Sequence, residues 1–243
     1  MQLNCDLGES YGSWTMGLDA QVMPHIEQAN IACGFHAGDP VTMANTLALA
    51  AQHGVTIGAH PAYPDLVGFG RRPMNLSAEE IIASLHYQIA ALEGMANCQQ
   101  LQVSYVKPHG ALYNDMMARV EVRSAIMQAI ASYHRPIALM LQATPELDSH
   151  RREAESFGLA MLFEAFADRC YDDDGKLLSR SRPGAVHDRE KMLAQVDQLQ
   201  REGTVTTVGG KLIELRADTL CVHGDNLEWV QAIEAIRALV DGN

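Results

Sequence analysis

The sequence predicts an α/β protein that folds as one TIM-like β/α barrel over residues 1–243. Short apolar runs alternate with amphipathic, helix-like segments along the chain, which is typical of a parallel sheet covered by helices. Seven strand-like runs occur in 243 residues, close to the length of one barrel, and favour a closed barrel over an open doubly wound sheet. No linker, low-complexity segment or composition shift divides the chain, so we expect a single domain.

The expected strands are short apolar runs bounded by polar or glycine-rich turns. They cover residues 3–6, 30–35, 55–59, 103–106, 137–141, 159–163 and 219–222. Several are apolar at nearly every position, so both faces of the sheet should be covered. Residues 204–216 look instead like a hairpin-like excursion from the alternating pattern.

The helix expected between the second and third strands has signals at both ends. Asp39 suits its N-cap, Pro40 suits its first position, and Gly54 should end it. The residues that helical spacing places on its apolar face are Met43, Leu47 and Ala51.

The following helix should begin with a capping box formed by Ser77 and Glu80. Its apolar residues at helical spacing are Ile81, Leu85, Ile89 and Leu92. Further helices are expected after Pro145, over residues 187–202, and from about Leu227 to close the chain.

The composition is that of an ordinary globular protein, with 47% hydrophobic and 20% charged residues. The formal net charge of −12 repels nucleic-acid phosphates and anionic lipid, so we expect neither nucleic acid nor a membrane as a partner. An anionic substrate stays compatible with this charge, because a site can be locally basic.

The sequence also predicts a cytoplasmic location. The first residues run directly into a strand-like pattern without the features of a signal peptide, and no apolar run approaches the roughly 18 residues of a spanning helix. The five cysteines are odd in number and widely spaced, which favours reduced thiols over disulfides or a thiolate zinc site.

Polar residues gather directly after the predicted strands, where parallel β/α folds build their active sites. Four of the ten histidines occupy such positions, namely His36, His60, His109 and His223. The charged residues at these positions are Asp6, Glu9, Asp39, Asp65, Lys107, Asp168, Arg169 and Asp225. Because these strand ends share one rim, we expect a functional cleft. A structural hydrogen bond is the alternative role for each histidine taken alone, and helix capping is the alternative for Asp39 and Asp225.

Two loops combine glycine with arginine. Residues 68–72 carry Arg71 and Arg72, whose guanidinium groups could bind carboxylate or phosphate while the glycines allow close approach. Arg180 and Arg182, with Gly184, form a similar loop. Ordinary surface turns with solvated arginines are an equally good interpretation of both.

Standard nucleotide-binding and nucleophile motifs are missing from the sequence. Residues 203–211 superficially resemble a phosphate-binding loop, but the spacing fails and Leu212 stands where Ser or Thr is required. No Gly-x-Gly-x-x-Gly follows a strand, and no Gly-x-Ser-x-Gly is present. The residues by themselves therefore predict a β/α-barrel hydrolase or lyase with a rim of His, Asp and Lys.

These motifs strongly resemble those of the family of 5-oxoprolinase A subunits, also called the LamB/YcsF family. The likeness covers nearly the whole chain. The matching stretches are NCDLGE (4–9), ANIACGFHAGD (29–39), IGAHP (57–61), PD (64–65), GFGRR (68–72), VKPHGALYN (106–114), FADR (166–169), PGA (183–185) and CVHGD (221–225). The departures are Cys170, where a small residue is expected before Tyr171, and a shortened start before Asn4. Neither affects a rim residue.

The resemblance implies a seven-stranded barrel similar to the glycoside hydrolase and deacetylase barrels. It implies hydrolysis of 5-oxoproline (pyroglutamate) to L-glutamate, coupled to hydrolysis of Mg²⁺-bound ATP, with 5-oxoprolinase subunits B and C as partners. A five-membered lactam is a poor electrophile, so phosphorylation of its amide oxygen would make attack by water feasible. The missing phosphate-binding loop then means a non-standard nucleotide site or one completed by the partners.

The resemblance also suggests roles for the rim residues. His109 or His60 is expected as general base, and Asp6 and Asp225 would orient a histidine. Lys107, Arg71 and Arg72 would bind the substrate carboxylate or the phosphoryl group. The expected catalytic set is Asp6, His36, His60, His109 and Asp225, and the expected binding set is Glu9, Arg71, Arg72, Lys107, Asn114, Asp168, Arg169 and His223.

Two other functions stay open at this point. One is a metal-dependent, deacetylase-like hydrolase in which Asp and His residues of the rim hold Zn²⁺ with an open position. The other is a non-catalytic binding subunit of a lactam-utilisation complex, against which the rim histidines argue.

Overall fold

Parallel strands close into a barrel in the computed structural model, which describes residues 1–180, 182–224 and 227–241. The strands follow the order β1 (Gln2–Leu7), β2 (Gln28–Ala32), β3 (Thr56–His60), β4 (Val103–Val106), β5 (Ala138–Gln142), β6 (Met161–Phe166) and β9 (Thr219–Val222). β9 closes the barrel by pairing with both β1 and β6. The predicted seven-stranded β/α barrel is confirmed.

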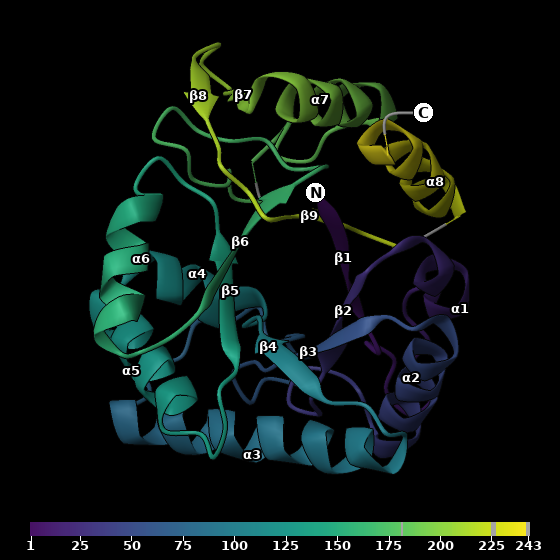
Figure 1. The fold of residues 1–243 in the computed structure, drawn as a ribbon, viewed down its shortest axis with the longest axis vertical. Helices are drawn as coiled ribbons and strands as arrows, with labels where there is room; N and C mark the ends of the chain where they lie inside the picture. Colours follow the sequence, from purple (N-terminus) through teal and green to yellow (C-terminus); the bar gives the residue numbers. More distant parts are fainter. Residues whose placement is uncertain (181, 225–226, 242–243) are drawn as a thin grey trace.

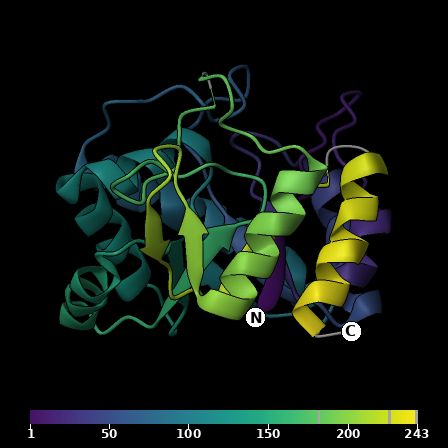
Figure 2. The same ribbon diagram turned by 90° about the horizontal axis from the view of Figure 1, so that it is seen from above.

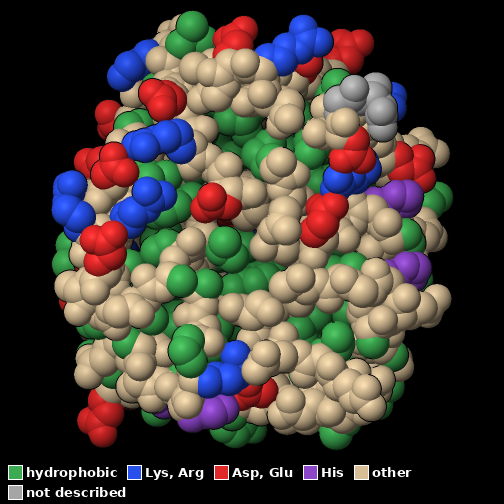
Figure 3. Space-filling view, in the orientation of Figure 1, with side chains coloured by type: hydrophobic (Ala, Val, Ile, Leu, Met, Phe, Trp, Pro, Cys, Tyr) green, Lys and Arg blue, Asp and Glu red, His purple; other side chains and the backbone are tan. Residues whose placement is uncertain are grey.

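Helices surround the strands on the outside of the barrel (Figure 1). They are α1 (Asp19–Val22), the 3₁₀ helix η1 (Met23–His25), α2 (Pro40–His53), α3 (Ala78–Cys98), α4 (Gly110–Ala118), α5 (Val120–Ala131), α6 (Leu147–Ser156), α7 (Arg189–Glu202) and α8 (Leu227–Asp241). Figure 2 shows the N-terminus at one end of the molecule and the long loops at the opposite end. On the face drawn in Figure 3, basic and acidic side chains lie next to one another along one edge, without a patch of single sign there.

The predicted helix ends are confirmed where side-chain caps exist. Asp39 accepts hydrogen bonds from the backbone N–H groups of Val41 and Thr42, and Gly54 ends α2 with a φ of 66°. The capping box before α3 forms as expected from its sequence. The capping role of Asp39, one of the two interpretations left open by the sequence, is therefore the one the fold adopts.

The short segments α1 and η1 and the longer helices α4 and α5 were not predicted. The ends of α4 and α5 carry no capping signals. His109 and Arg119 occupy their N-cap positions, and neither side chain makes a capping hydrogen bond. Burial of apolar side chains, including Leu112 and Ile126, holds them against the barrel instead.

Three details of the predicted elements are wrong. β6 runs over Met161–Phe166 rather than residues 159–163. β2 ends at Ala32 rather than Phe35, because Gly34 takes a φ of 92° and turns the chain out of the sheet. In α2 the buried residue is Ala50, while Ala51 is exposed. Met43 and Leu47 are buried as expected, so the apolar face differs from the expected one only at its last residue.

The excursion predicted over residues 204–216 is an antiparallel hairpin of β7 (Thr204–Thr206) and β8 (Leu212–Glu214). All five cysteines are free thiols, as expected from their spacing. Among the described residues, no helix has the length and apolarity needed to cross a membrane.

Gly58 in β3 makes room for a large side chain inside the barrel. It lies in register with Tyr105 of β4, and a Cβ atom at Gly58 would lie 2.1 Å from the Tyr105 ring. The Tyr105 hydroxyl donates a hydrogen bond of 2.6 Å to Asn30 Oδ1, so the ring has a fixed partner on its far side.

We predict that Gly58→Ala destabilises the protein, because the new methyl group collides with a ring that has nowhere to move. Overpacking of this kind costs about 1–3 kcal/mol. Gly94→Ala in α3 is the matched control, since its Cβ would meet nothing within 4 Å and alanine favours a helix. Urea unfolding of both variants measures the difference, and equal free energies of unfolding would contradict the prediction.

Candidate functional site

A cavity of about 970 Å³ is lined by segments that follow β1, β3, β4, β5, β6 and β9. Residues far apart in the sequence therefore meet at one end of the barrel, as the positions of the rim residues predict. The wall residues that the sequence had singled out are Asp6, Glu9, His60, Arg71, Lys107, His109, Asn114, Arg169, Arg180 and His223.

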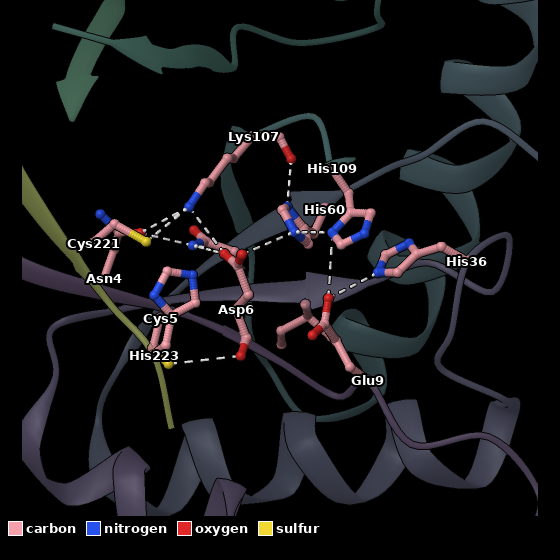
Figure 4. Close-up of polar contacts among 12 residues, drawn as sticks. Asn4, Cys5, Asp6, Glu9, His36, His60, Lys107, His109, Cys221 and His223 are labelled. Atoms are coloured by element: carbon pink, nitrogen blue, oxygen red, sulfur yellow. Dashed lines mark hydrogen bonds and ion pairs between the residues drawn. The ribbon is translucent and has the colours of Figure 1, made fainter. Parts of the chain in front are cut away.

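Lys107 follows β4 and lies almost fully buried beside the cavity, with 3% of its surface exposed. Its Nζ lies 2.9 Å from Asp6 Oδ1 and 2.9 Å from Glu164 Oε2 (Figure 4). It also donates to Asn4 Oδ1 at 3.3 Å. Asn30 Nδ2 in turn donates to Asp6 Oδ1 at 2.8 Å, so the carboxylate has partners on two strands.

Strand periodicity and register bring this network together. Side chains two residues apart in a strand point to the same face, which sends Asn4 and Asp6 of β1 into the barrel together. Asp6 pairs with Asn30 of β2, and Asn4 pairs with Cys221 of β9. A shift by one residue would turn both side chains outward.

The network fixes the charges of Asp6 and Lys107. Burial acts to raise the pKa of Asp6, but the attraction of His60 and Lys107 is stronger and holds this pKa well below 3.8. Burial likewise acts to lower the pKa of Lys107, but Asp6 and Glu164 raise it well above 10.5. Both groups therefore stay ionised throughout the neutral pH range.

Three buried imidazoles form a second group with Glu9. The rings of His36 and His109 are stacked, with centroids 3.8 Å apart and planes 6° from parallel. The ring of His60 stands at 86° to that of His109. Glu9 Oε1 lies 3.0 Å from His36 Nε2 and 3.3 Å from His109 Nδ1. Donor atoms of these four residues lie within 4.8 Å of one another, close enough to hold a metal ion.

Backbone carbonyls determine the tautomers of His60 and His109. His60 Nδ1 lies 2.7 Å from the carbonyl oxygen of Lys107, and His109 Nε2 lies 2.9 Å from that of Phe69. A carbonyl oxygen only accepts, so each of these nitrogens carries the hydrogen. When both rings are neutral, the other nitrogens, His60 Nε2 and His109 Nδ1, face each other with lone pairs at 3.0 Å.

Burial, followed by the effect of neighbouring histidines, lowers the pKa of His36 and His109 well below 6.5. Both imidazoles are accordingly neutral at neutral pH. Neutral imidazole is the form that accepts a proton or binds a metal ion.

The loop of residues 68–72 supports the histidine group from outside. Gly70 has a φ of 63°, and a Cβ atom there would lie 2.8 Å from His109 and 2.9 Å from His36. Glycine is thus needed both for the backbone conformation and for the close approach. The Gly70 carbonyl also accepts from the Ala111 N–H, which ties the loop to the start of α4.

The two arginines of this loop have different roles. Arg71 lines the cavity, with its guanidinium group 5.0 Å from the Phe69 ring centroid. Arg72 instead bonds Asp65 through Nε at 2.9 Å and is not among the residues of the cavity wall. In this structure the Arg72 side chain therefore stabilises the turn and lies apart from the cavity that was expected to bind substrate.

Cationic side chains also line the opposite wall of the cavity, next to the acidic residues Glu146, Asp173 and Asp174. Arg169 is buried, donates through Nη2 to the Leu178 carbonyl, and has an Nε without a hydrogen-bond partner. Arg180 donates to His223 Nε2 at 3.0 Å, and His223 Nδ1 lies 3.1 Å from Asp168 Oδ1. Burial opposes a charge on His223, but Asp168 raises its pKa above 6.5. Protonation of His223 would require Arg180 to move away, because both imidazole nitrogens would then carry a hydrogen and Nε2 could no longer accept from Arg180.

The remaining predicted site residues fall into three classes. Asn114 lies on the cavity wall. His36 lies behind His109, and Asp168 lies behind His223, so both support wall residues. Asp225 lies outside the described residues.

Sequence reasoning missed Glu164 and Tyr113. Glu164 is fully buried in β6 and faces Lys107, and Tyr113 lies on the cavity wall with a buried hydroxyl. A carboxylate in the middle of an apolar strand was the available signal for Glu164, because such a group is buried only when it has a partner. Tyr113 stands in the family motif VKPHGALYN, but an aromatic residue in a helix that was not predicted is most simply interpreted as a core residue.

Comparison with known proteins gives a consistent result over the whole chain. The sequence matches the LamB/YcsF family over residues 1–243. The A subunit of a 5-oxoprolinase from Pseudomonas fluorescens is 55% identical over 236 residues, covering 97% of this chain and 94% of the relative. The A subunit of a 5-oxoprolinase from Chromohalobacter salexigens is 54% identical over 241 residues, covering 99% of this chain and 96% of the relative.

Among solved structures, a lactam utilization protein from Thermus thermophilus superposes with a TM-score of 0.91. Its sequence is 39% identical, and the match covers 100% of this chain and 96% of that one. The barrel and the loops that build the cavity therefore have a full-length structural counterpart.

We predict that Lys107→Met strongly destabilises the protein. The change leaves Asp6 and Glu164 in the barrel without their cation, and breaking a buried pair in this way costs about 3–5 kcal/mol. Adding Glu164→Gln should recover part of the loss, because one uncompensated carboxylate is removed. Urea unfolding at pH 7 tests both variants. A single variant as stable as the original protein would show that Lys107 is not needed for charge compensation.

A second prediction concerns the pH dependence of the 68–72 loop. Hydrogen bonds from Arg72 lower the pKa of Asp65 to about 2. A lowered pKa contributes stability above the ordinary value of 3.8, and this contribution is lost as the pH falls toward 2. Asp65→Asn should therefore lower the thermal midpoint by about 2–4 °C at pH 7. The difference should shrink below pH 3.8 in a series of melting curves, and a difference that grows in acid would contradict this assignment.

Proposed function

Since the chain belongs to the LamB/YcsF family, we propose that it is the A subunit of an ATP-dependent 5-oxoprolinase. This enzyme hydrolyses the lactam of 5-oxoproline to L-glutamate, and the chain acts in it together with subunits B and C. The observation that carries the proposal is full-length identity of 55% to a protein named as the A subunit of 5-oxoprolinase. The cytoplasm is the expected location.

The chemistry explains why ATP is required. An unstrained amide is a poor electrophile, so the terminal phosphoryl group of Mg²⁺-bound ATP is transferred to the lactam oxygen, releasing ADP. Water then attacks the activated carbon, the ring C–N bond breaks, and a second water releases phosphate to leave glutamate. The sequence has no standard phosphate-binding loop, so we place the nucleotide at a non-standard site or one completed by subunits B and C.

The histidine pair is suited to accept the proton of the attacking water. His60 Nε2 and His109 Nδ1 present lone pairs at the cavity wall, 3.0 Å apart. Asp6 Oδ2 lies 3.4 Å from His60 Nε2 and favours a positive charge on the pair once a proton arrives. In this proposal His60 or His109 is the general base and Asp6 stabilises its protonated form.

The cationic wall is suited to bind the substrate carboxylate or the phosphoryl group. Arg169 has a buried N–H without a partner, and Arg71 lines the same cavity. Lys107 is already paired with two carboxylates, so we assign the anion-binding role mainly to the arginines. An arginine fork matches a carboxylate with two parallel hydrogen bonds.

The direct test is glutamate release that depends on ATP and 5-oxoproline, measured with this chain and purified subunits B and C together. Omission of this chain should abolish release. If B and C alone release glutamate at the full rate, the proposal is wrong. If the chain is needed but no variant of the histidine pair affects the rate, it is a non-catalytic binding subunit.

We predict that His109→Gln lowers kcat of the three-subunit mixture by at least about 100-fold, the usual contribution of a general base. The fold should persist, because glutamine can still donate to the Phe69 carbonyl. His53→Gln at an exposed position of α2 is the matched control and should keep full activity. Circular dichroism of both variants checks the fold, and full activity of His109→Gln would remove this residue from the mechanism.

A further inference from the structure

The space between His60 and His109 has two lone pairs directed at each other. Each ring donates its only N–H group to a backbone carbonyl, so neither has a hydrogen left for the 3.0 Å contact between them. Two acceptors at this distance repel each other unless a cation lies between them. Both side chains are at least nine-tenths buried, so water can reach these nitrogens only from the cavity that they line.

The charges around this space also call for a cation. Asp6 lies 3.4 Å from His60, and Glu9 lies 3.3 Å from His109. Glu164 joins the same network through Lys107, the ammonium group that contacts both it and Asp6. Three carboxylates against one ammonium group leave a formal charge of −2 on the connected network. Burial makes such an excess costly.

The distances between the candidate ligand atoms fit one metal ion. Ligands at about 2.0–2.1 Å from a tetrahedral centre lie roughly 3.3 Å from one another. The pairs formed by His60 with His109 and by His109 with Glu9 are separated by 3.0 and 3.3 Å, and ligand atoms of all three residues lie within 4.8 Å of one another. Figure 4 shows that His109 contacts both His60 and Glu9, while Asp6 lies on the far side of His60.

The geometry also excludes two neighbouring side chains as ligands. The His36 ring is stacked on His109, so a metal ion in the plane of His109 lies far out of the plane of His36. His36 therefore serves to hold Glu9. On the other side of Asp6, the Cys221 sulfur lies 3.3 Å from the Lys107 ammonium, which would repel a second metal ion there.

We propose that Glu9, His60 and His109 bind a divalent transition-metal ion such as Zn²⁺. Imidazole and carboxylate donors suit Zn²⁺, Co²⁺ or Ni²⁺ better than Mg²⁺ or Ca²⁺. The carbonyls of Lys107 and Phe69 hold the two rings by their far nitrogens, the support that metal-binding histidines usually have. Metal binding would occupy the lone pairs of His60 and His109, so it would replace the general-base role proposed above for these histidines. The metal site itself does not depend on the identity of the organic substrate.

The test measures metal binding directly, on the full chain purified without an affinity tag or chelator. Elemental analysis should find about one equivalent of Zn²⁺ or a related metal per chain. After removal of metal, competition with a chromophoric chelator should give a Kd for Zn²⁺ below about 1 µM. Bound Co²⁺ should show the intense visible absorption of tetrahedral coordination.

Variants then locate the site. His60→Gln and His109→Gln should each weaken Zn²⁺ binding by at least about 100-fold. His36→Gln should weaken it less, and His53→Gln should leave it unchanged. Circular dichroism checks the fold of each variant. Whether the unaltered chain binds metal is decided by its own binding data, even if a variant fails to fold. The proposal would be overturned if the unaltered chain bound none of Zn²⁺, Co²⁺ and Ni²⁺ stoichiometrically. It would also be overturned if both His60→Gln and His109→Gln retained binding. The contact between the two rings would then be explained by a proton shared between them.

Discussion

The site depends on one constraint: the positive charge of the buried Lys107 ammonium group must be compensated by carboxylates. Asp6 and Glu164 contact it from β1 and β6, strands that are neighbours of β9 rather than of β4. They can reach Lys107 only because β9 closes the barrel. Closure and charge pairing therefore support each other: the barrel brings the carboxylates together, and the ion pairs stabilise an interior that holds several polar groups.

The end of β4 connects this network to the histidine group. The Lys107 carbonyl accepts the His60 Nδ1 hydrogen, and the Pro61 carbonyl accepts the His109 backbone N–H at 2.8 Å. The segment at the end of β3 thus donates a hydrogen bond to the segment after β4 and accepts another from it. Because the orientations of both rings follow from backbone positions, the two facing nitrogens are set by the fold rather than by side-chain freedom.

The cavity has two chemically different sides. Histidines and carboxylates lie on the side of β1 and β3, while Arg169, Arg180 and His223 lie on the side of β6 and β9. A small molecule with an anionic group and an amide would be oriented by this difference, with its anion toward the arginines. Such an arrangement suits the proposed lactam substrate, whose carboxylate is adjacent to the ring nitrogen.

The sequence by itself determined the barrel, the capped helices and the positions of the rim histidines, because hydrophobic period and capping depend on residues a few positions apart. It also carried the motifs of the family. Only the tertiary structure decided that Glu164 faces Lys107, that Arg72 turns to Asp65, and that His60 and His109 face each other with lone pairs. These features depend on which groups barrel closure brings within about 3 Å, the range of a hydrogen bond, and no local pattern encodes that distance.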